Sequence, residues 1–154
     1  MTDETEDTSL YLPGLAGLYQ QLAPFGYPLM RFAAGAILIV HGYGKLFGGF
    51  APIIAQRVLT PMGFPLPTFW AYFLGVLETL GAACLAVGFL TRPMAAMLAF
   101  EFIFVTDWHS KNGYGFSAQG GGYEYPLLLL AIYVGILLQG SGRYSVDRAI
   151  GREF

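Results

Sequence analysis

Long apolar runs separated by short stretches rich in glycine and proline are the main pattern of this chain. About 20 predominantly apolar residues in a helix cross the hydrocarbon core of a bilayer. Four runs reach or approach that length, and proline stands at or near the start of several of them. The sequence therefore predicts an all-α fold, a membrane four-helix bundle with spans at residues 28–47, 69–90, 93–108 and 123–139.

Two shorter segments flank the first predicted span. Residues 10–27 carry no charge but include two prolines and three glycines, which disfavour a regular transmembrane helix. We interpret this stretch as an interfacial segment on the membrane surface, with its tyrosines at headgroup level. Residues 51–59 have the pattern of a short amphipathic helix, which a proline-rich turn follows. We expect this helix to cover the mouth of the bundle. A disordered acidic tail at residues 1–9, a transmembrane domain at 28–147 and a cytoplasmic tail at 148–154 complete the predicted organisation.

Composition supports a membrane protein. Of the 154 residues, 55% are hydrophobic and 12% charged, and the mean hydropathy is +0.54. A water-soluble domain carries about 25% charged residues. The net charge is −2, no basic run indicates a nucleic-acid partner, and the acidic N-terminus does not resemble a secretory signal.

The distribution of basic residues predicts the orientation. With four spans both termini share one side, and that side carries more arginine and lysine than the other. Cytoplasmic loops are enriched in these residues, so we expect both termini in the cytoplasm.

Two carboxylates in the middle of predicted spans are the first candidate functional residues. Glu78 lies near the centre of the second span and Glu101 near the centre of the third. A charge at that depth costs several kcal/mol unless it is paired, protonated or directed into a polar cavity. We therefore expect both side chains to face neighbouring helices rather than lipid.

The first span supplies candidate partners for these acids. Arg31 and Lys45 recur on one face, within about 40° of each other on a helical wheel, and His41 lies one turn before Lys45. Arg31 with Glu101, or Lys45 with Glu78, could form ion pairs that only fix the helix arrangement.

At the predicted outer end of the bundle, His109 follows the third span and Glu124 begins the fourth. Each also has a structural interpretation. His109 would be a histidine at a helix interface whose hydrogen bonds are satisfied, and Glu124 would be a carboxylate that stabilises the start of a helix. The candidate ligand-binding set is therefore Arg31, His41, Lys45, Glu78, Glu101, His109 and Glu124.

Other chemistry finds little support. Cys84 is the single cysteine, which excludes a dithiol within this chain, and it has the character of a small buried residue. The histidines and acids lack a diagnostic metal-ligand spacing, so no metal site is predicted. No nucleophile–base or phosphate-loop motif is present, and we predict no intrinsic cofactor.

A series of short motifs carries a family resemblance. They are RFAAGAILIVHGYGKL from Arg31, LGVLETLGAA from Leu74, GFLTRP from Gly88, then His109, GGYEY from Gly121 and GSGRYSVD from Gly140. In this order and spacing the chain resembles the DoxX family of small four-span proteins of the bacterial inner membrane.

The resemblance implies a membrane four-helix bundle in the inner membrane. Some relatives are linked to respiratory or redox systems, one of them similar to a subunit of thiosulfate:quinone oxidoreductase, and others join membrane complexes against oxidative stress. It assigns no catalytic residues, but Arg31, Lys45, Glu78, His109, Glu124 and Asp147 match recurring polar positions of the family. Glu101 and residues 10–27 look like additions of this chain.

Three hypotheses about function follow. The first is a membrane subunit of a redox system that binds a quinone or another small ligand between its helices, beside other subunits or further copies of itself. Since no self-contained catalytic motif is present, electrons would come from a partner or a bound cofactor. The second is a small proton-coupled transporter, because midplane acids facing a cavity serve such proteins. The third is an assembly or scaffold protein whose acids are structural.

Overall fold

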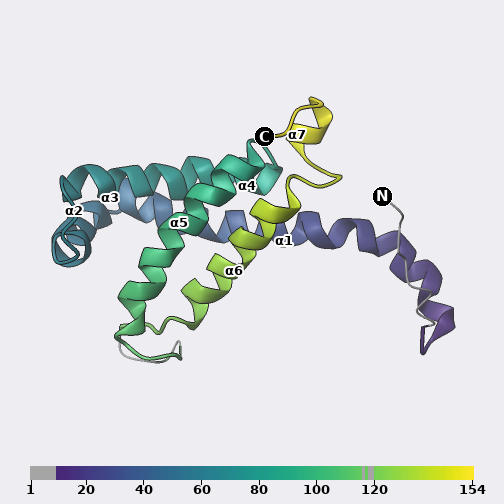
Figure 1. Ribbon diagram of the computed structural model, residues 1–154, viewed down its shortest axis with the longest axis horizontal. Coiled ribbons are helices and arrows are strands. Elements are labelled where there is room, and N and C mark those ends of the chain that lie inside the picture. The colour runs from purple at the N-terminus through teal and green to yellow at the C-terminus, as the bar shows by residue number, and fades with distance from the viewer. Residues whose placement is uncertain (1–9, 116, 118–119) are drawn as a thin grey trace.

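The computed structural model describes residues 10–115, 117 and 120–154, and every regular element in this part of the chain is helical (Figure 1). The acidic tail predicted at residues 1–9 lies outside the described residues. The fold class is therefore all-α, as the sequence predicts.

The first helix is longer than expected. After a 3₁₀ turn, η1 (Pro13–Leu15), helix α1 runs without interruption from Ala16 to Phe47. The predicted helix start at Pro28 is wrong, because both Pro24 and Pro28 lie inside α1. Proline removes one backbone hydrogen bond and bends a helix without always ending it, and α1 changes direction in its N-terminal part (Figure 1). The position of residues 10–27 on the membrane surface stays a prediction.

The second predicted span is one continuous helix with a widened middle. It comprises α3 (Pro67–Val76), a π-helical segment η3 (Leu77–Gly81) and α4 (Ala82–Val87). It ends at Gly88, whose φ of 74° is one that side-chain-bearing residues rarely adopt. The sequence placed the helix well but gave no sign of the π segment, which contains Glu78.

The remaining helices follow the predicted ranges closely. Helix α5 (Thr91–Ser110) and helix α6 (Glu124–Gln139) pack side by side as a pair (Figure 1). The short helix between the first two spans consists of α2 (Phe50–Ile54) and a π-helical turn η2 (Ala55–Leu59). A last short helix, α7 (Val146–Ala149), follows α6.

Close backbone contact joins α1 to the second span. A Cβ atom on Gly42 would lie 2.6 Å from the backbone nitrogen of Thr79, and one on Gly35 would lie 2.8 Å from the Cβ of Ala86. Small residues at such positions let helices approach closely in lipid. The core between the two helix pairs is apolar and includes Leu38, Leu85, Leu98, Phe102, Tyr133 and Ile136.

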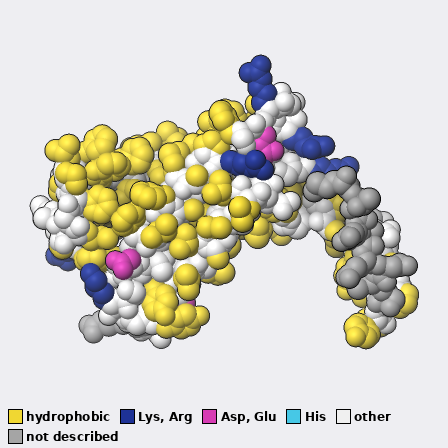
Figure 2. Space-filling view, viewed as in Figure 1, with side chains coloured by type: hydrophobic (Ala, Val, Ile, Leu, Met, Phe, Trp, Pro, Cys, Tyr) yellow, Lys and Arg dark blue, Asp and Glu magenta, His cyan; other side chains and the backbone are white. Residues whose placement is uncertain are grey.

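The outer surface is that of a membrane protein. Figure 2 shows hydrophobic side chains over most of the visible face, with basic side chains gathered near the C-terminal end and more at the opposite end. The helices Pro13–Phe47 and Pro67–Val87 have the length and hydropathy to cross a bilayer. Helix α6 has 16 residues and is shorter than a full span. All-helical structure is confirmed, while the four-span bundle stays a prediction.

Candidate functional site

A large cavity opens between the helices near the end of α1. Its volume is about 1190 Å³. Its walls come from the last turns of α1, from α2 and η2, from the α3–η3 helix, from α5, and from the start of α6. Most of the lining side chains are hydrophobic, among them Phe73, Leu77, Phe100 and both tryptophans of the chain, Trp70 and Trp108. Sites that take small organic ligands are typically apolar cavities with a few polar groups.

Three charged residues on the cavity wall form a cluster that we call the cavity triad: Lys45, Glu78 and Glu101. The Lys45 ammonium group forms an ion pair with Oε2 of Glu78 and lies 3.8 Å from Oε1 of Glu101. Glu78 and Glu101 are 3% and 5% exposed. Both acids face inward, as the sequence predicts, and of the two suggested pairs the structure contains Lys45 with Glu78.

The backbone explains how these three groups meet. Lys45 lies in the last turn of α1, and the glycine at position 42 brings that turn against the π segment. Within η3 the Thr79 hydroxyl donates to the Gly75 carbonyl at 2.8 Å, which pairs one acceptor of the widened helix. Wide turns of this kind often mark functional sites. Glu101 reaches the triad from the middle of α5.

Two histidines also line the cavity. Nδ1 of His109 lies 2.8 Å from the Val105 carbonyl oxygen, which can only accept a hydrogen bond, so this nitrogen carries the proton. In the neutral ring the other nitrogen is then an acceptor. His41 is exposed, and its ring lies 6.5 Å from that of Tyr125. The cavity wall therefore offers both hydrogen-bond donors and acceptors.

Two of the predicted site residues lie elsewhere. Glu124 is half-buried at the start of α6 and does not line the cavity. The ion pairs among the described residues do not include Arg31 with Glu101, so the suggested pair between them is wrong. The reason is that Arg31 has backbone partners nearer to hand: it donates to the carbonyls of Ser141 and Tyr144, the latter at 2.7 Å.

Arg31 belongs to a second buried group, which we call the tail cluster: Arg31, Asp147, the turn of residues 88–91 and the segment 141–144. Asp147 accepts hydrogen bonds from the backbone nitrogens of Leu90 and Thr91 at 2.8 and 2.9 Å and from the Thr91 hydroxyl at 2.7 Å. Its own backbone nitrogen donates to the Gly88 carbonyl at 2.9 Å. The cluster ties the C-terminal segment to the start of α5.

The ionised form of Asp147 is favoured in the folded protein. Burial alone would raise the pKa of Asp147, but the hydrogen bonds from Thr91 and Leu90 and the nearby Arg31 charge together hold that pKa below its ordinary value. Asp147 was not among the predicted ligand-binding residues. Its structural role could have been suspected because three of the family-like motifs, around Arg31, Gly88 and Asp147, converge here.

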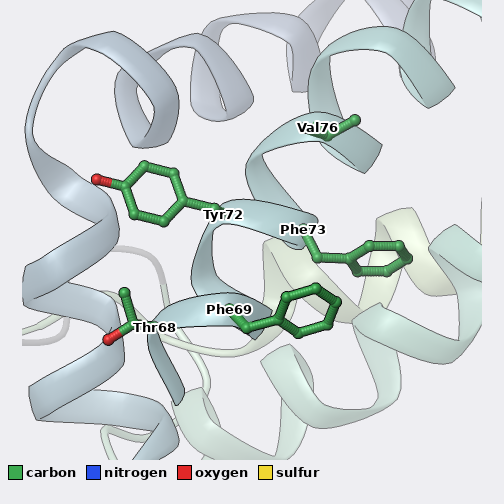
Figure 3. Close-up of a pocket in the computed structure, with 5 residues that line it drawn as sticks. All are labelled: Thr68, Phe69, Tyr72, Phe73 and Val76. Carbon is green, nitrogen blue, oxygen red and sulfur yellow. The ribbon is translucent and has the colours of Figure 1, made fainter. Parts of the chain in front are cut away.

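A second hollow lies on the outside of the molecule. Figure 3 shows five residues of α3 around a groove of about 410 Å³: Thr68, Phe69, Tyr72, Phe73 and Val76. Its lining is apolar, and the larger side chains are exposed on the surface. No charged residue lines this groove, so it has the character of a lipid-facing surface.

Within the part of the chain that the structure describes, no three His, Cys, Asp or Glu side chains gather as a metal site. Cys84 is half-buried in α4 and does not line the cavity. Trp70 and Tyr125 line the cavity without having been predicted there, whereas Trp108 was expected near His109 at this end of the bundle. Tyr125 stands in the GGYEY motif, which was a usable signal, and Trp70 carried none beyond its position near a predicted helix end.

Comparison with known proteins agrees with this picture. The family model described as DoxX matches residues 26–110. The chain is also similar to the inner membrane protein YphA of Escherichia coli (strain K12), with 25% identity over 128 residues that cover 78% of this chain and 86% of the relative. No solved structure matches the chain significantly.

Proposed function

The chain belongs to the DoxX family of membrane proteins, and from this premise we propose that it is a membrane subunit of a redox system that binds a quinone-like ligand in the cavity. The observation that carries the proposal is an apolar cavity of about 1190 Å³ with Lys45, Glu78, Glu101, His41 and His109 at its wall. A quinone has the matching chemistry, because it joins an apolar ring and tail to two polar oxygens.

The polar wall suggests a role for each side chain. Lys45 can donate to a carbonyl oxygen of the ring, and His41 or His109 can bind the other oxygen. Glu78 can exchange a proton with the ligand, since a carboxyl group at hydrogen-bond distance is a competent acid or base. Electrons would come from a partner subunit, because the chain's own residues supply no dithiol pair.

The location follows from the family, and the orientation is proposed. The relative's name places that protein in the inner membrane. We propose the same location for this chain. Arg92 lies in the first turn of α5, and Arg143, Arg148 and Arg152 follow α6, so the positive-inside rule favours cytoplasmic termini. A cysteine introduced near each terminus, labelled from outside in intact cells, would test this.

Both tryptophans line the cavity, which gives a direct test of binding. Titration of the purified protein with a short-chain quinone should quench the intrinsic fluorescence with saturation. Ala96 lines the cavity and Ala131 is exposed on α6, so Ala96→Phe should weaken binding at least about 10-fold by filling the site, whereas Ala131→Phe should not. Glu78→Gln measures the contribution of the triad. If neither the wild type nor Glu78→Gln shows saturable binding, the proposal is rejected.

A proton-coupled transporter is the second candidate, and the cavity triad favours it. Two carboxyl groups beside one ammonium group can share a proton inside an apolar wall, which is an arrangement that proton relays use. Liposome flux with and without a pH gradient distinguishes the two functions. Gradient-dependent flux that Glu101→Gln abolishes would favour transport over ligand binding for electron transfer.

A further inference from the structure

Among the described residues of the cavity wall, Glu101 has two buried carboxyl oxygens without a hydrogen-bond donor, whereas Glu78 has one. Glu101 is 5% exposed, and both of its oxygens are buried with no hydrogen-bond donor among the described residues. A buried acceptor without a donor costs about 1–3 kcal/mol or more when charged. A hydrogen-bond donor on a ligand would satisfy such a group.

The neighbouring side chains are already engaged. The Lys45 ammonium contacts Glu78 directly and reaches Oε1 of Glu101 only at 3.8 Å, beyond hydrogen-bond distance. The hydroxyl of Tyr133 donates to the Ala34 carbonyl at 3.2 Å. Since Glu101 lines the cavity, the missing donor can come from a ligand there.

We propose that Glu101 is the specificity-determining residue of the cavity and that it selects ligands whose ring carries a hydroxyl donor, the quinol rather than the quinone form. This inference rests on the proposed function, and it adds the redox state of the ligand that binds more tightly. Glu101 accepts the hydroxyl hydrogen, and Lys45 donates to an oxygen of the same ring.

The choice between the two forms follows from hydrogen-bonding capacity. An ionised carboxylate only accepts, and a protonated carboxyl group donates once and still accepts. A hydroxyl group both donates and accepts, so it can pair with Glu101 in either state. A quinone carbonyl only accepts, so it can pair with Glu101 only when that carboxyl group is protonated, whereas the hydroxyl group pairs in both states. Hydrogen bonds to charged acceptors are also the stronger ones.

The apolar part of the ligand has a route into the cavity. Val40, Ile53 and Phe100 line the cavity and are also exposed on the outer surface, at 73%, 47% and 64%. The cavity wall is therefore continuous with the face that meets the acyl chains. A ring with an alkyl tail fits this geometry, because the tail stays against lipid while the ring reaches the triad.

The test compares three probes with the same ring and tail. They are a decyl-substituted hydroquinone kept reduced without oxygen, its quinone, and its dimethyl ether, in which both hydroxyl hydrogens are replaced. Binding to the purified full chain is measured by calorimetry. We expect the hydroquinone to bind about 10-fold more tightly than the ether.

Variants assign that preference to one residue. Glu101→Leu should reduce the preference to about twofold or less, while the ether still binds it with wild-type affinity, which shows that the cavity is intact. Glu101→Gln keeps an acceptor and should show an intermediate preference. Asp107→Asn changes an exposed carboxylate on the same helix, outside the cavity, and should keep the full preference.

The outcomes separate this inference from the proposed function. Equal affinities in the wild type, or a preference that persists in Glu101→Leu, would overturn the inference alone. Tighter binding of decylammonium than of the hydroquinone would also overturn it, because Glu101 would then be a cation site. If none of the ring compounds binds with saturation, the proposed function fails and this inference with it.

Discussion

Two buried polar clusters can be compared along the same helix, since α1 contributes a basic residue to each. Arg31 in the tail cluster and Lys45 in the cavity triad are roughly 21 Å apart at the rise of an α-helix. Each basic residue lies near a buried carboxylate from a later element, Asp147 in one case and Glu78 in the other. From composition alone the two sites are hard to tell apart.

Their hydrogen bonding separates them. In the tail cluster, both oxygens of Asp147 accept hydrogen bonds, and Arg31 donates to backbone carbonyls of the C-terminal segment. In the cavity triad, both oxygens of Glu101 are without a donor, and the group faces an open cavity. A buried carboxylate whose oxygens all accept hydrogen bonds indicates a structural role. A buried carboxyl group without donors beside a cavity indicates a binding site. The predictions below test this difference through the free energy of unfolding, measured by denaturation in detergent micelles.

The largest effect is expected at Arg31. Arg31→Met removes a buried cation and leaves the carbonyls of Ser141 and Tyr144 without donors, which should lower the free energy of unfolding by about 3–5 kcal/mol. Arg143→Met is the matched control, because Arg143 is exposed beside the ring of Tyr144, and its effect should stay within about 0.5 kcal/mol. Equal effects of the two substitutions would contradict the structural role of Arg31.

Asp147 should give a pH-dependent loss. Because the pKa of Asp147 is lowered in the folded protein, its ionised form stabilises the fold above the ordinary carboxyl range near pH 4, and that stabilisation disappears as the pH falls below it. Asp147→Asn should cost about 1.5–3 kcal/mol at pH 7. The difference between wild type and variant should shrink below about pH 4. A difference that is constant from pH 7 to pH 3 would argue against an ionised Asp147.

A moderate effect is expected at the helix contact between the clusters. Gly42→Ala adds a methyl group 2.6 Å from the backbone nitrogen of Thr79, so α1 must move away from η3. We expect a cost of about 1–2 kcal/mol, together with weaker quenching of the cavity tryptophans by a quinone. Gly26→Ala lies on the same helix with no neighbour within 4 Å, and it should be neutral or slightly stabilising. Similar losses in both variants would show that helix propensity, not close contact, decides.

The smallest effect on stability is expected at Glu101. Glu101→Leu removes a buried carboxyl group that lacks a donor, so the free energy of unfolding should change by less than about 1 kcal/mol, toward greater stability. Asp147→Leu provides the comparison and should be strongly destabilising. If Glu101→Leu costs as much as Asp147→Leu, the cavity triad is a structural ion pair network, and the contrast between the clusters is lost.

Much of the fold could be predicted from the sequence. Apolar runs bounded by glycine and proline located the second span and helices α5 and α6 to within a few residues, because burial in lipid and helix-ending residues leave local signals. The start of α1 could not be predicted in this way. Pro28 favours a helix start when it is considered alone, and only packing decides that the helix continues through it.

The candidate site was predictable in part and for a definable reason. Depth along a span correctly suggested Lys45 with Glu78, since their helices are neighbours in sequence and the two residues lie at similar heights. The same argument failed for Arg31, because it ignored the carbonyls of the chain's C-terminal segment, more than a hundred residues away. The widening of η3 depends on tertiary contacts and has no sequence signal of its own.

That widened turn has a mechanical consequence. The second span is one continuous helix whose geometry changes at the residue that bears the acid. If Leu77–Gly81 rewound into regular α-geometry, the Glu78 side chain would swing around the helix axis and away from the ammonium group of Lys45. Helix geometry and cavity charge are therefore coupled at η3. A partner that displaces α3 or α4 can alter the electrostatics around the ligand without touching the ligand.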